Sequence, residues 1–251
     1  MSALTASDLA PRELGRPTPN LVVSEIFGPT FQGEGPSLGR RCSFLRLGAC
    51  NLHCSWCDTP YTWDWTGRNG RVYDPRLELS RVSVDAVWQS LKAQGTDALV
   101  VSGGEPMLQQ RQLLPLLDRV ATAGWWVEIE TAGTVAPEPK LLPLISRFNV
   151  SPKLANSGND ANHRYQPAAL DALQSSHKAA WKFVVEIPAD LDEVAELVDR
   201  HSLWPVYVMP EGIRPDVISS RSQELAEAVL ARGWNLTTRL HILLYGNRRG
   251  V

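Results

Sequence analysis

Apolar residues along the chain recur with two spacings that alternate from one end to the other. Short runs rich in aliphatic and aromatic residues predict β-strands at residues 21–26, 43–47, 98–102, 125–130, 148–150, 181–185, 206–209 and 240–244. Longer stretches with apolar residues three or four positions apart predict helices at residues 83–94, 111–123, 167–175, 190–201 and 221–232. The helix at 83–94 has the clearest pattern, because its apolar residues share one face, Ser83 can cap its start and Gly95 can end it.

Alternating strands and helices indicate an α/β fold with a mostly parallel sheet and helices outside it. The chain is too short after its first segments for eight complete β/α units, so we expect a partial barrel that is open on one side. Residues 1–20 contain three prolines and few large apolar side chains, which predicts a flexible N-terminal arm. Residues 21–251 are then expected to form a single domain.

Composition and charge exclude several classes of protein. Hydrophobic residues make up 43% of the chain, which is ordinary for a globular protein and too many for a disordered one. The formal net charge is −2, so the chain lacks the basic surplus with which proteins usually bind nucleic acid. No long apolar run predicts a membrane span or a secretory signal, and we expect a soluble, cytoplasmic protein.

The cysteines are clustered. Of the four in the chain, Cys50, Cys54 and Cys57 lie within eight residues with the spacing C-x3-C-x2-C. Such a cluster favours metal binding or redox chemistry over a disulfide framework. Three thiolates leave a coordination position free, which favours a catalytic iron–sulfur cluster, with structural zinc or free buried thiols as alternatives. Cys42 is interpreted as an ordinary buried small residue.

Polar motifs follow the predicted strands at the points where the strands end. They are residues 50–59, Gly103-Gly104-Glu105-Pro106, residues 130–133, Ser151-Pro152-Lys153 and residues 210–212. Ligands of parallel α/β folds bind at the carboxyl ends of the strands. We therefore expect these motifs to converge on one rim.

The cysteine motif has an aromatic residue, Trp56, before its last cysteine, and it resembles the signature of radical S-adenosylmethionine enzymes, as does the Gly-Gly-Glu-Pro motif. From about residue 26 to the end, further motifs are similar to those of the 7-carboxy-7-deazaguanine synthase family. These are Phe31-Gln-Gly-Glu34-Gly35, Arg46 before the cysteines, Cys57-Asp58-Thr59 and Ser151-Pro-Lys153.

This resemblance implies a radical S-adenosylmethionine fold with a 4Fe-4S cluster on three cysteines, whose fourth iron is chelated by S-adenosylmethionine. It implies the ring contraction of 6-carboxy-5,6,7,8-tetrahydropterin to 7-carboxy-7-deazaguanine, with loss of ammonia, in queuosine-type deazapurine biosynthesis. It also implies a Mg²⁺ ion that binds the Thr59 hydroxyl, and it suggests that Gly103 and Gly104 leave room for the amino group of the cofactor.

The resemblance also assigns residues to each ligand. The metal ligands are Cys50, Cys54, Cys57 and Thr59, and the S-adenosylmethionine site comprises Trp56, Cys57, Asp58, Gly104, Ser151, Pro152, Lys153, Met209, Pro210, Glu211 and Gly212. The pterin site comprises Phe31, Gln32, Gly33, Glu34, Arg46, Ser102 and His241, the last expected on a strand. Lys182 and Asn247 are not assigned to the site.

Two partners follow from the same resemblance, an electron donor such as flavodoxin or ferredoxin and a second copy of the chain in a homodimer. Two alternatives stay open at this point. One is another small radical S-adenosylmethionine enzyme, such as a glycyl-radical activase, and the other is a zinc-stabilised binding module.

Overall fold

The computed structural model describes residues 19–251. Their central element is a nine-stranded sheet. The strands run in the order β3-β1-β2-β4-β5-β6-β7-β8-β9 across the sheet. β1 pairs antiparallel with β2 and β3, and all pairings from β2 to β9 are parallel. The strands are β1 (Asn20–Phe31), β2 (Arg41–Leu47), β3 (Ser80–Ser83), β4 (Ala98–Gly103), β5 (Trp126–Thr131), β6 (Arg147–Val150), β7 (Ala179–Val185), β8 (Val206–Pro210) and β9 (Asn235–Leu236).

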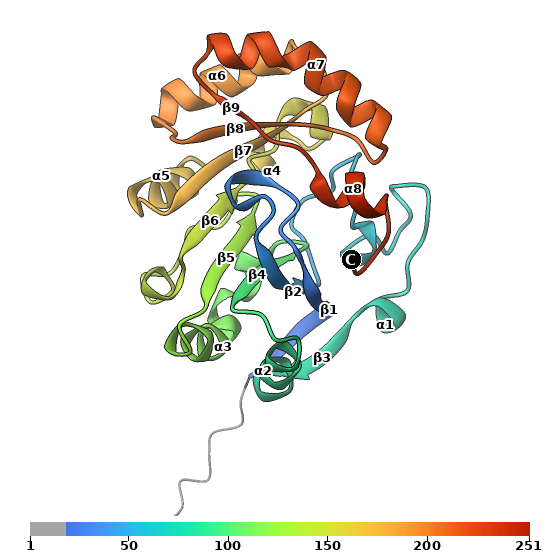
Figure 1. The fold of residues 1–251 in the computed structure, drawn as a ribbon, viewed down its shortest axis with the longest axis vertical. Helices are drawn as coiled ribbons and strands as arrows, with labels where there is room; N and C mark the ends of the chain where they lie inside the picture. Colours follow the sequence, from blue (N-terminus) through green and yellow to red (C-terminus); the bar gives the residue numbers. More distant parts are fainter. Residues whose placement is uncertain (1–18) are drawn as a thin grey trace, which may run out of the picture.

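Helices cover the outer face of this curved sheet, which forms an open partial barrel (Figure 1). The helices of the described residues are α1 (Pro75–Glu78), α2 (Val84–Ala93), α3 (Gln110–Thr122), α4 (Ala161–Arg164), α5 (Pro167–Ser175), α6 (Asp190–His201), α7 (Pro215–Ala231) and α8 (Leu240–Tyr245). Of these, α8 lies at the opening of the barrel and not on its outer face. Ser83 caps α2 as predicted, since its hydroxyl accepts the Ala86 amide at 3.2 Å. Within residues 19–251, no helix has both the length and the apolar character needed to cross a membrane.

Side-chain alternation along the strands separates the core from the pocket. On β7, Trp181, Phe183 and Val185 pack into the main core, on the sheet face that the helices cover. Lys182 and Val184 alternate with them and line a pocket inside the barrel. The outer face is therefore apolar and supports the fold, while the inner face can carry polar groups.

A smaller apolar cluster fills part of the barrel interior. It contains Cys42, Phe44, Ala98 and Val100, and Phe27 stacks on Phe44 with ring centroids 5.0 Å apart. Cys42 is fully buried in this cluster, which confirms its interpretation as an ordinary buried residue.

The predicted strand at residues 240–244 is wrong, because the segment forms α8. Ile242 is 1% exposed, whereas Leu243 and Leu244 are 46% and 51% exposed, so the segment buries one helical face. A short apolar run has no periodicity that separates strand from helix. The edge of the sheet is taken instead by β9, which the sequence did not predict.

Other differences lie at element ends. β1 continues five residues beyond the predicted end at 26 and places Phe31 at its terminus. β3 was not predicted, and α7 begins at Pro215 rather than at residue 221. The predicted flexible arm, residues 1–20, lies outside the described residues except for its last two positions.

Candidate active site

The inner side of the barrel contains a pocket of about 730 Å³ at the carboxyl ends of the parallel strands. The predicted motifs meet there, as expected. Of the predicted site residues, those that line it are Phe31, Gln32, Gly33, Glu34, Arg46, Cys50, Cys54, Trp56, Cys57, Asp58, Thr59, Ser102, Gly104, Ser151, Lys153, Met209, Glu211 and His241. Pro152, Pro210 and Gly212 are not among the lining residues.

The loop that carries the three cysteines is fastened to the Gly-Gly-Glu-Pro motif. The Gly104 amide donates to the Leu47 carbonyl at 3.0 Å, and the Glu105 amide donates to the Ala49 carbonyl at 2.9 Å. A Cβ on Gly104 would lie 1.9 Å from the Ala49 oxygen. The glycine therefore permits close packing of two backbones, in addition to the room for a cofactor that the sequence suggested.

Glu105 joins the ends of two strands. Its buried carboxylate accepts the Thr131 hydroxyl at 2.8 Å and the Ala132 amide at 2.7 Å, both at the end of β5. It also accepts the Met107 amide at 3.0 Å. Burial raises the pKa of Glu105, although these three hydrogen bonds favour its ionised form.

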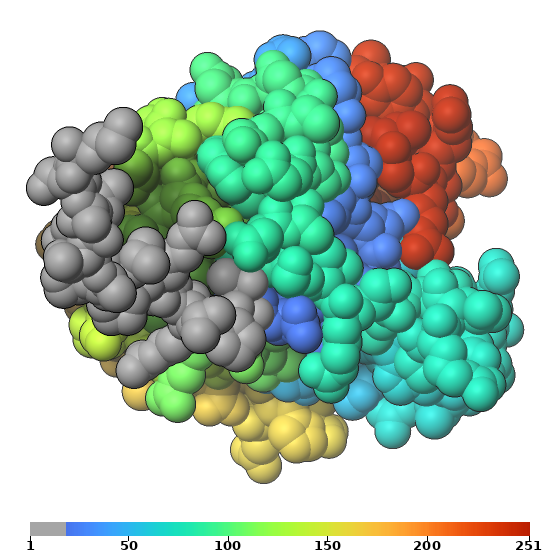
Figure 2. Space-filling view, turned by 90° about the horizontal axis from the view of Figure 1, so that it is seen from below, coloured from blue at the N-terminus to red at the C-terminus, as the bar shows by residue number. Residues whose placement is uncertain are grey.

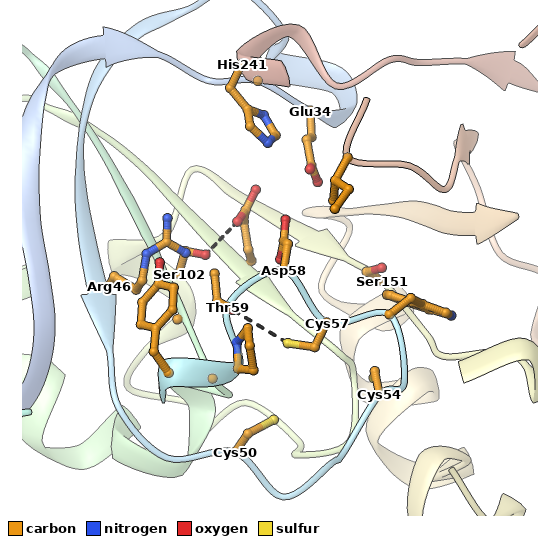
Figure 3. A pocket seen from close by; sticks show the side chains of 18 of the residues that line it. Glu34, Arg46, Cys50, Cys54, Cys57, Asp58, Thr59, Ser102, Ser151 and His241 are labelled. Carbon is orange, nitrogen blue, oxygen red and sulfur yellow. Dashed lines mark hydrogen bonds between the residues drawn. The ribbon is translucent and has the colours of Figure 1, made fainter. Parts of the chain in front are cut away.

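The three clustered thiols are free and face the pocket (Figure 3). Burial raises the pKa of Cys50 to about 12 and that of Cys57 to about 11, and it also raises the pKa of Cys54. Bare thiolates are thus disfavoured here, and a bound cation would compensate their charge. Each sulfur also accepts an N–H donor. This donor set fits an iron–sulfur cluster with three protein ligands.

Glu34 lies in a buried network of charges that sequence reasoning did not find. Its carboxylate accepts hydrogen bonds from Lys182 Nζ and, at 3.1 Å, from Arg239 Nε. Arg239 also bonds Asp58 and donates to the Gly212 carbonyl at 2.7 Å. Burial alone would raise the pKa of Glu34, but the two cations outweigh it and hold that pKa far below its usual value.

Arg239 therefore connects the Glu34 loop, the cysteine loop and the loop after β8. Its side chain is 7% exposed and that of Lys182 is 6% exposed. The inward position of Lys182 on β7 was a usable signal, since it alternates with core residues. Arg239 follows an irregular segment, where no alternation of side chains indicates which residues point inward.

His241 projects into the pocket from α8, on the side opposite the cysteines (Figure 3). A Cβ on Gly33 would lie 2.3 Å from its Nδ1, so the glycine permits the close approach. Burial lowers the pKa of His241. Glu34, Asp58 and His241 offer ligand atoms within 4.8 Å of one another, but both carboxylates already pair with cations.

A second polar group lies on β4 and β5. The Ser102 hydroxyl donates to Glu130 at 2.7 Å, and Gln32 Nε2 donates to Glu130 at 3.1 Å and to buried Glu128 at 2.7 Å. The side-chain amide of Gln32 therefore already has hydrogen-bond partners, and the residue is 1% exposed. Glu130, which the sequence did not assign to the site, is the partly exposed carboxylate of this group.

Arg46 lies in the pocket and pairs with Glu25 on the neighbouring strand, with Nε to Oε2 at 2.8 Å. Tyr61 donates to the same carboxylate oxygen at 3.1 Å. In the described part of the chain, no hydrogen bond is found for the two terminal nitrogens of Arg46, which leaves that end available to a ligand.

The last five residues, 247–251, also line the pocket. Arg249 fastens them, since its guanidinium bonds Glu25 at 2.5 Å and Glu78 at 2.7 Å and lies 3.7 Å from the Tyr61 ring centroid. Figure 2 shows the red C-terminal part of the chain beside the blue N-terminal strands and the teal residues 60–80. Asn247, which the sequence left unassigned, is part of this lining.

The predicted cofactor residues Trp56 and Lys153 lie together. Lys153 Nζ donates to the carbonyl and the hydroxyl of Ser151, each at 2.9 Å, and lies 5.6 Å from the Trp56 ring centroid. The Trp56 indole nitrogen is buried without a partner among the described residues. Thr59 Oγ1 lies 3.7 Å from the sulfur of Cys57, and Glu211 pairs with Arg221.

Comparisons with known proteins identify the family. A family model described as a 4Fe-4S single cluster domain matches residues 31–134. A 7-carboxy-7-deazaguanine synthase from Pyrobaculum aerophilum is 35% identical, over 93% of this chain and 98% of its own. The chain belongs to the 7-carboxy-7-deazaguanine synthase family. A family member from Rhodopirellula baltica is 31% identical, over 97% of each chain.

The fold of this chain agrees with that of a solved structure. The crystal structure of QueE from Escherichia coli matches it with a TM-score of 0.67 and 26% identity, over 88% of this chain and 95% of that chain. The partial barrel that was expected from the sequence, with its mostly parallel sheet, is confirmed.

Proposed function

We propose that this chain converts 6-carboxy-5,6,7,8-tetrahydropterin into 7-carboxy-7-deazaguanine and ammonia by radical chemistry. One observation carries the proposal: three free thiols and a set of polar groups suited to a carboxylated pterin line the same pocket. Its volume of about 730 Å³ is in the range of small-molecule sites. Product and ammonia together have the composition of the substrate, so the reaction consumes no oxidant.

Cys50, Cys54 and Cys57 would hold the cluster and leave one iron for S-adenosylmethionine. When bound, the cluster and this cofactor supply the radical that abstracts hydrogen from the substrate. The proposed cofactor residues Ser151 and Lys153 offer a hydroxyl and an ammonium group from the loop after β6. Together with Trp56, Asp58, Gly104, Met209 and Glu211 they would orient it and exclude water. Pro152, Pro210 and Gly212, which do not line the pocket, would shape the loops that carry these residues.

Thr59 is the proposed Mg²⁺ ligand. The alternative group of Glu34, Asp58 and His241 is less suited to the ion, because Lys182 and Arg239 already neutralise its carboxylates. Mg²⁺ commonly keeps several waters and takes few protein ligands. One hydroxyl, together with water and a substrate carboxylate, meets that requirement.

Arg46 is the proposed ligand of the substrate carboxylate. Glu25 fixes its Nε and leaves the terminal nitrogens for a charge-assisted hydrogen bond. His241 would lie near the carboxylate end of the substrate. Gln32 and Ser102 would position Glu130, whose carboxylate can accept hydrogen bonds from the amino and ring N–H groups of a pterin. Phe31, Gly33 and Glu34 would complete the substrate wall.

The remaining assignments extend this proposal beyond the pocket. An electron donor of the flavodoxin or ferredoxin type, a homodimer, a cytoplasmic location and a single domain at residues 21–251 are proposed from the sequence. Queuosine-type deazapurine biosynthesis is the proposed pathway.

The decisive experiment is an anaerobic assay of reconstituted protein with S-adenosylmethionine, a reductant, Mg²⁺ and the carboxytetrahydropterin. We expect 7-carboxy-7-deazaguanine and ammonia in equal amounts. Cleavage of S-adenosylmethionine with no change in the pterin would point instead to another small radical enzyme. A colourless protein with stoichiometric zinc would point to a binding module.

A further inference from the structure

Each of the three clustered sulfurs accepts a hydrogen bond from nitrogen. The Leu52 amide donates to Cys50 Sγ at 3.4 Å, from within the cysteine motif itself. The other two donors are side chains outside the motif. Trp63 Nε1 lies 3.3 Å from Cys57 Sγ, and Asn159 Nδ2 lies 3.3 Å from Cys54 Sγ. These two side chains have no role in the proposed ligand contacts.

The indole of Trp63 is held in place from several sides. Trp63 is 7% exposed, its amide donates to the Pro60 carbonyl at 3.0 Å, and its ring meets the His53 ring at a centroid distance of 4.9 Å. The next residue, Asp64, accepts the amides of Gly67 and Asn69, each at 2.8 Å, and so fixes the loop that follows. The N–H is therefore aimed at the sulfur by a rigid surrounding.

Asn159 is positioned by the loop after β6. Its Oδ1 accepts the His53 amide at 2.8 Å, while its Nδ2 also donates to the Ser157 hydroxyl at 3.1 Å. The Ser157 carbonyl accepts the Ser55 amide at 3.0 Å. Two neighbouring loops are thus joined on both sides of Cys54, and the amide nitrogen of Asn159 has little freedom to turn away.

We propose that Trp63 and Asn159 raise the reduction potential of the cluster by donating to the sulfurs of Cys57 and Cys54. This inference rests on the proposed function, because it requires the cluster to be bound. Reduction adds one electron, makes and breaks no bond, and increases the negative charge shared by the irons and sulfurs. N–H donors stabilise the more negative state, and hydrogen bonds to sulfur are one of the factors that set cluster potentials.

The size of the effect follows from the difference in hydrogen-bond strength between the two oxidation states. Hydrogen bonds to ionised acceptors are the stronger ones, and reduction makes the sulfurs more negative, so the bond is stronger in the reduced state. A change of about tenfold in the reduction equilibrium for each donor is expected, which corresponds to about 59 mV for one electron. A donor of this kind would let a milder one-electron reductant start the reaction.

The test is a redox titration of the reconstituted 4Fe-4S protein, followed by electron paramagnetic resonance, in the absence of substrate. Trp63→Phe keeps a ring against His53 but removes the N–H. Trp65→Phe makes the same chemical change two residues away, where no bond to sulfur is found among the described residues. Asn159→Ala removes the second donor. Asn156→Ala is its control, since Asn156 donates to Val184 and Asp190 instead.

We expect each donor variant to have a potential lower by about 59 mV and each control to match the wild type. An unchanged potential in Trp63→Phe with a full cluster would overturn the inference. If Trp63→Phe assembles no cluster, the comparison of Asn159→Ala with Asn156→Ala decides. A lower potential in Asn159→Ala supports the inference, and an unchanged potential overturns it. A wild-type protein that assembles no cluster would instead overturn the proposed function.

Discussion

The four cysteines are all free thiols, yet their surroundings differ. Cys42 packs among Phe44, Ala98 and Val100, whereas Cys50, Cys54 and Cys57 line the pocket. Burial raises the pKa of Cys42 to about 12, as it does for the pocket thiol Cys50, so protonation does not distinguish the two kinds. The difference is geometric, because three sulfurs converge on one space and the fourth faces apolar side chains.

Cys54→Ala should abolish binding of the 4Fe-4S cluster, because the site then keeps two thiolates. The matched variant Cys42→Ala should retain full iron and sulfide and lose only about 1 kcal/mol of stability through the smaller side chain. Iron and sulfide analysis with the absorption near 400 nm measures both. Loss of the cluster in Cys42→Ala would contradict the assignment of ligands.

In the cluster-free protein, Glu34→Gln should lower the free energy of unfolding by about 3 kcal/mol at pH 7, because Lys182 and Arg239 lose their buried partner. Urea unfolding measures this difference. Glu227→Gln, at an exposed position on α7, is the control and should change little. An equal effect in the two variants would show that the buried network contributes nothing particular.

The ion pairs of Glu34 also predict that the stability of the protein depends on pH. Lys182 and Arg239 hold the pKa of Glu34 below its usual 4.5, even though burial opposes them. The stability that ionised Glu34 contributes is therefore complete above pH 4.5 and is lost as the pH falls below it. The gap in unfolding free energy between wild type and Glu34→Gln should narrow between pH 5 and pH 3.5, and a constant gap would refute the pairing.

At the scale of elements, the turn after β4 and the loop after β2 behave as one unit. Backbone hydrogen bonds from Gly104 and Glu105 join them, and Glu105 links the same turn to the end of β5. The cysteine loop has no helix or strand of its own beyond one short 3-10 turn, Pro60–Thr62. Its shape therefore depends on the neighbouring turn.

Gly104→Ala should disrupt the cysteine loop, because the new Cβ would meet the Ala49 carbonyl oxygen at 1.9 Å. We expect cluster content to fall to below about half and unfolding free energy to fall by about 2 kcal/mol or more. Gly70→Ala is the control, since its positive φ carries a small cost but no heavy atom lies within 4 Å. Equal cluster content in the two variants would argue against the backbone contact.

At the scale of the whole molecule, the first strand and the C-terminal segment meet beside the pocket. β1 supplies Glu25, residues 60–80 supply Tyr61 and Glu78, and the C-terminal segment supplies Arg249, which contacts all three. Glu25 also holds Arg46. The C-terminal segment is thus connected through one carboxylate to the proposed ligand of the substrate carboxylate.

Arg249→Ala should release this segment and raise KM for the pterin several-fold, while kcat falls less, because substrate binding rather than the chemical step is affected. Arg81→Ala removes an exposed arginine that does not line the pocket and should leave KM within about twofold of the wild type. Steady-state kinetics under anaerobic conditions decide the matter, and a KM that does not separate the two variants would rule out the connection.

The amino-acid sequence by itself determined most of the alternating strands and helices, but not β3, β9, α1, α4 or α8. It also determined the three-thiol site and the rim on which the motifs meet. Those features depend on local periodicity and on close spacing, as in Cys50, Cys54 and Cys57. The prediction that Cys42 is an ordinary buried residue was also correct, because its strand neighbours are core residues.

Tertiary structure alone decided the partners of the charged residues. Glu34 and Arg239 are 205 positions apart, and Glu25 and Arg249 are 224 apart, so no local pattern could pair them. It also decided that β9 occupies the sheet edge beside β8, while residues 240–245 form a helix that buries Ile242. Contacts between distant segments arise only when the barrel curves and brings its loops to one opening.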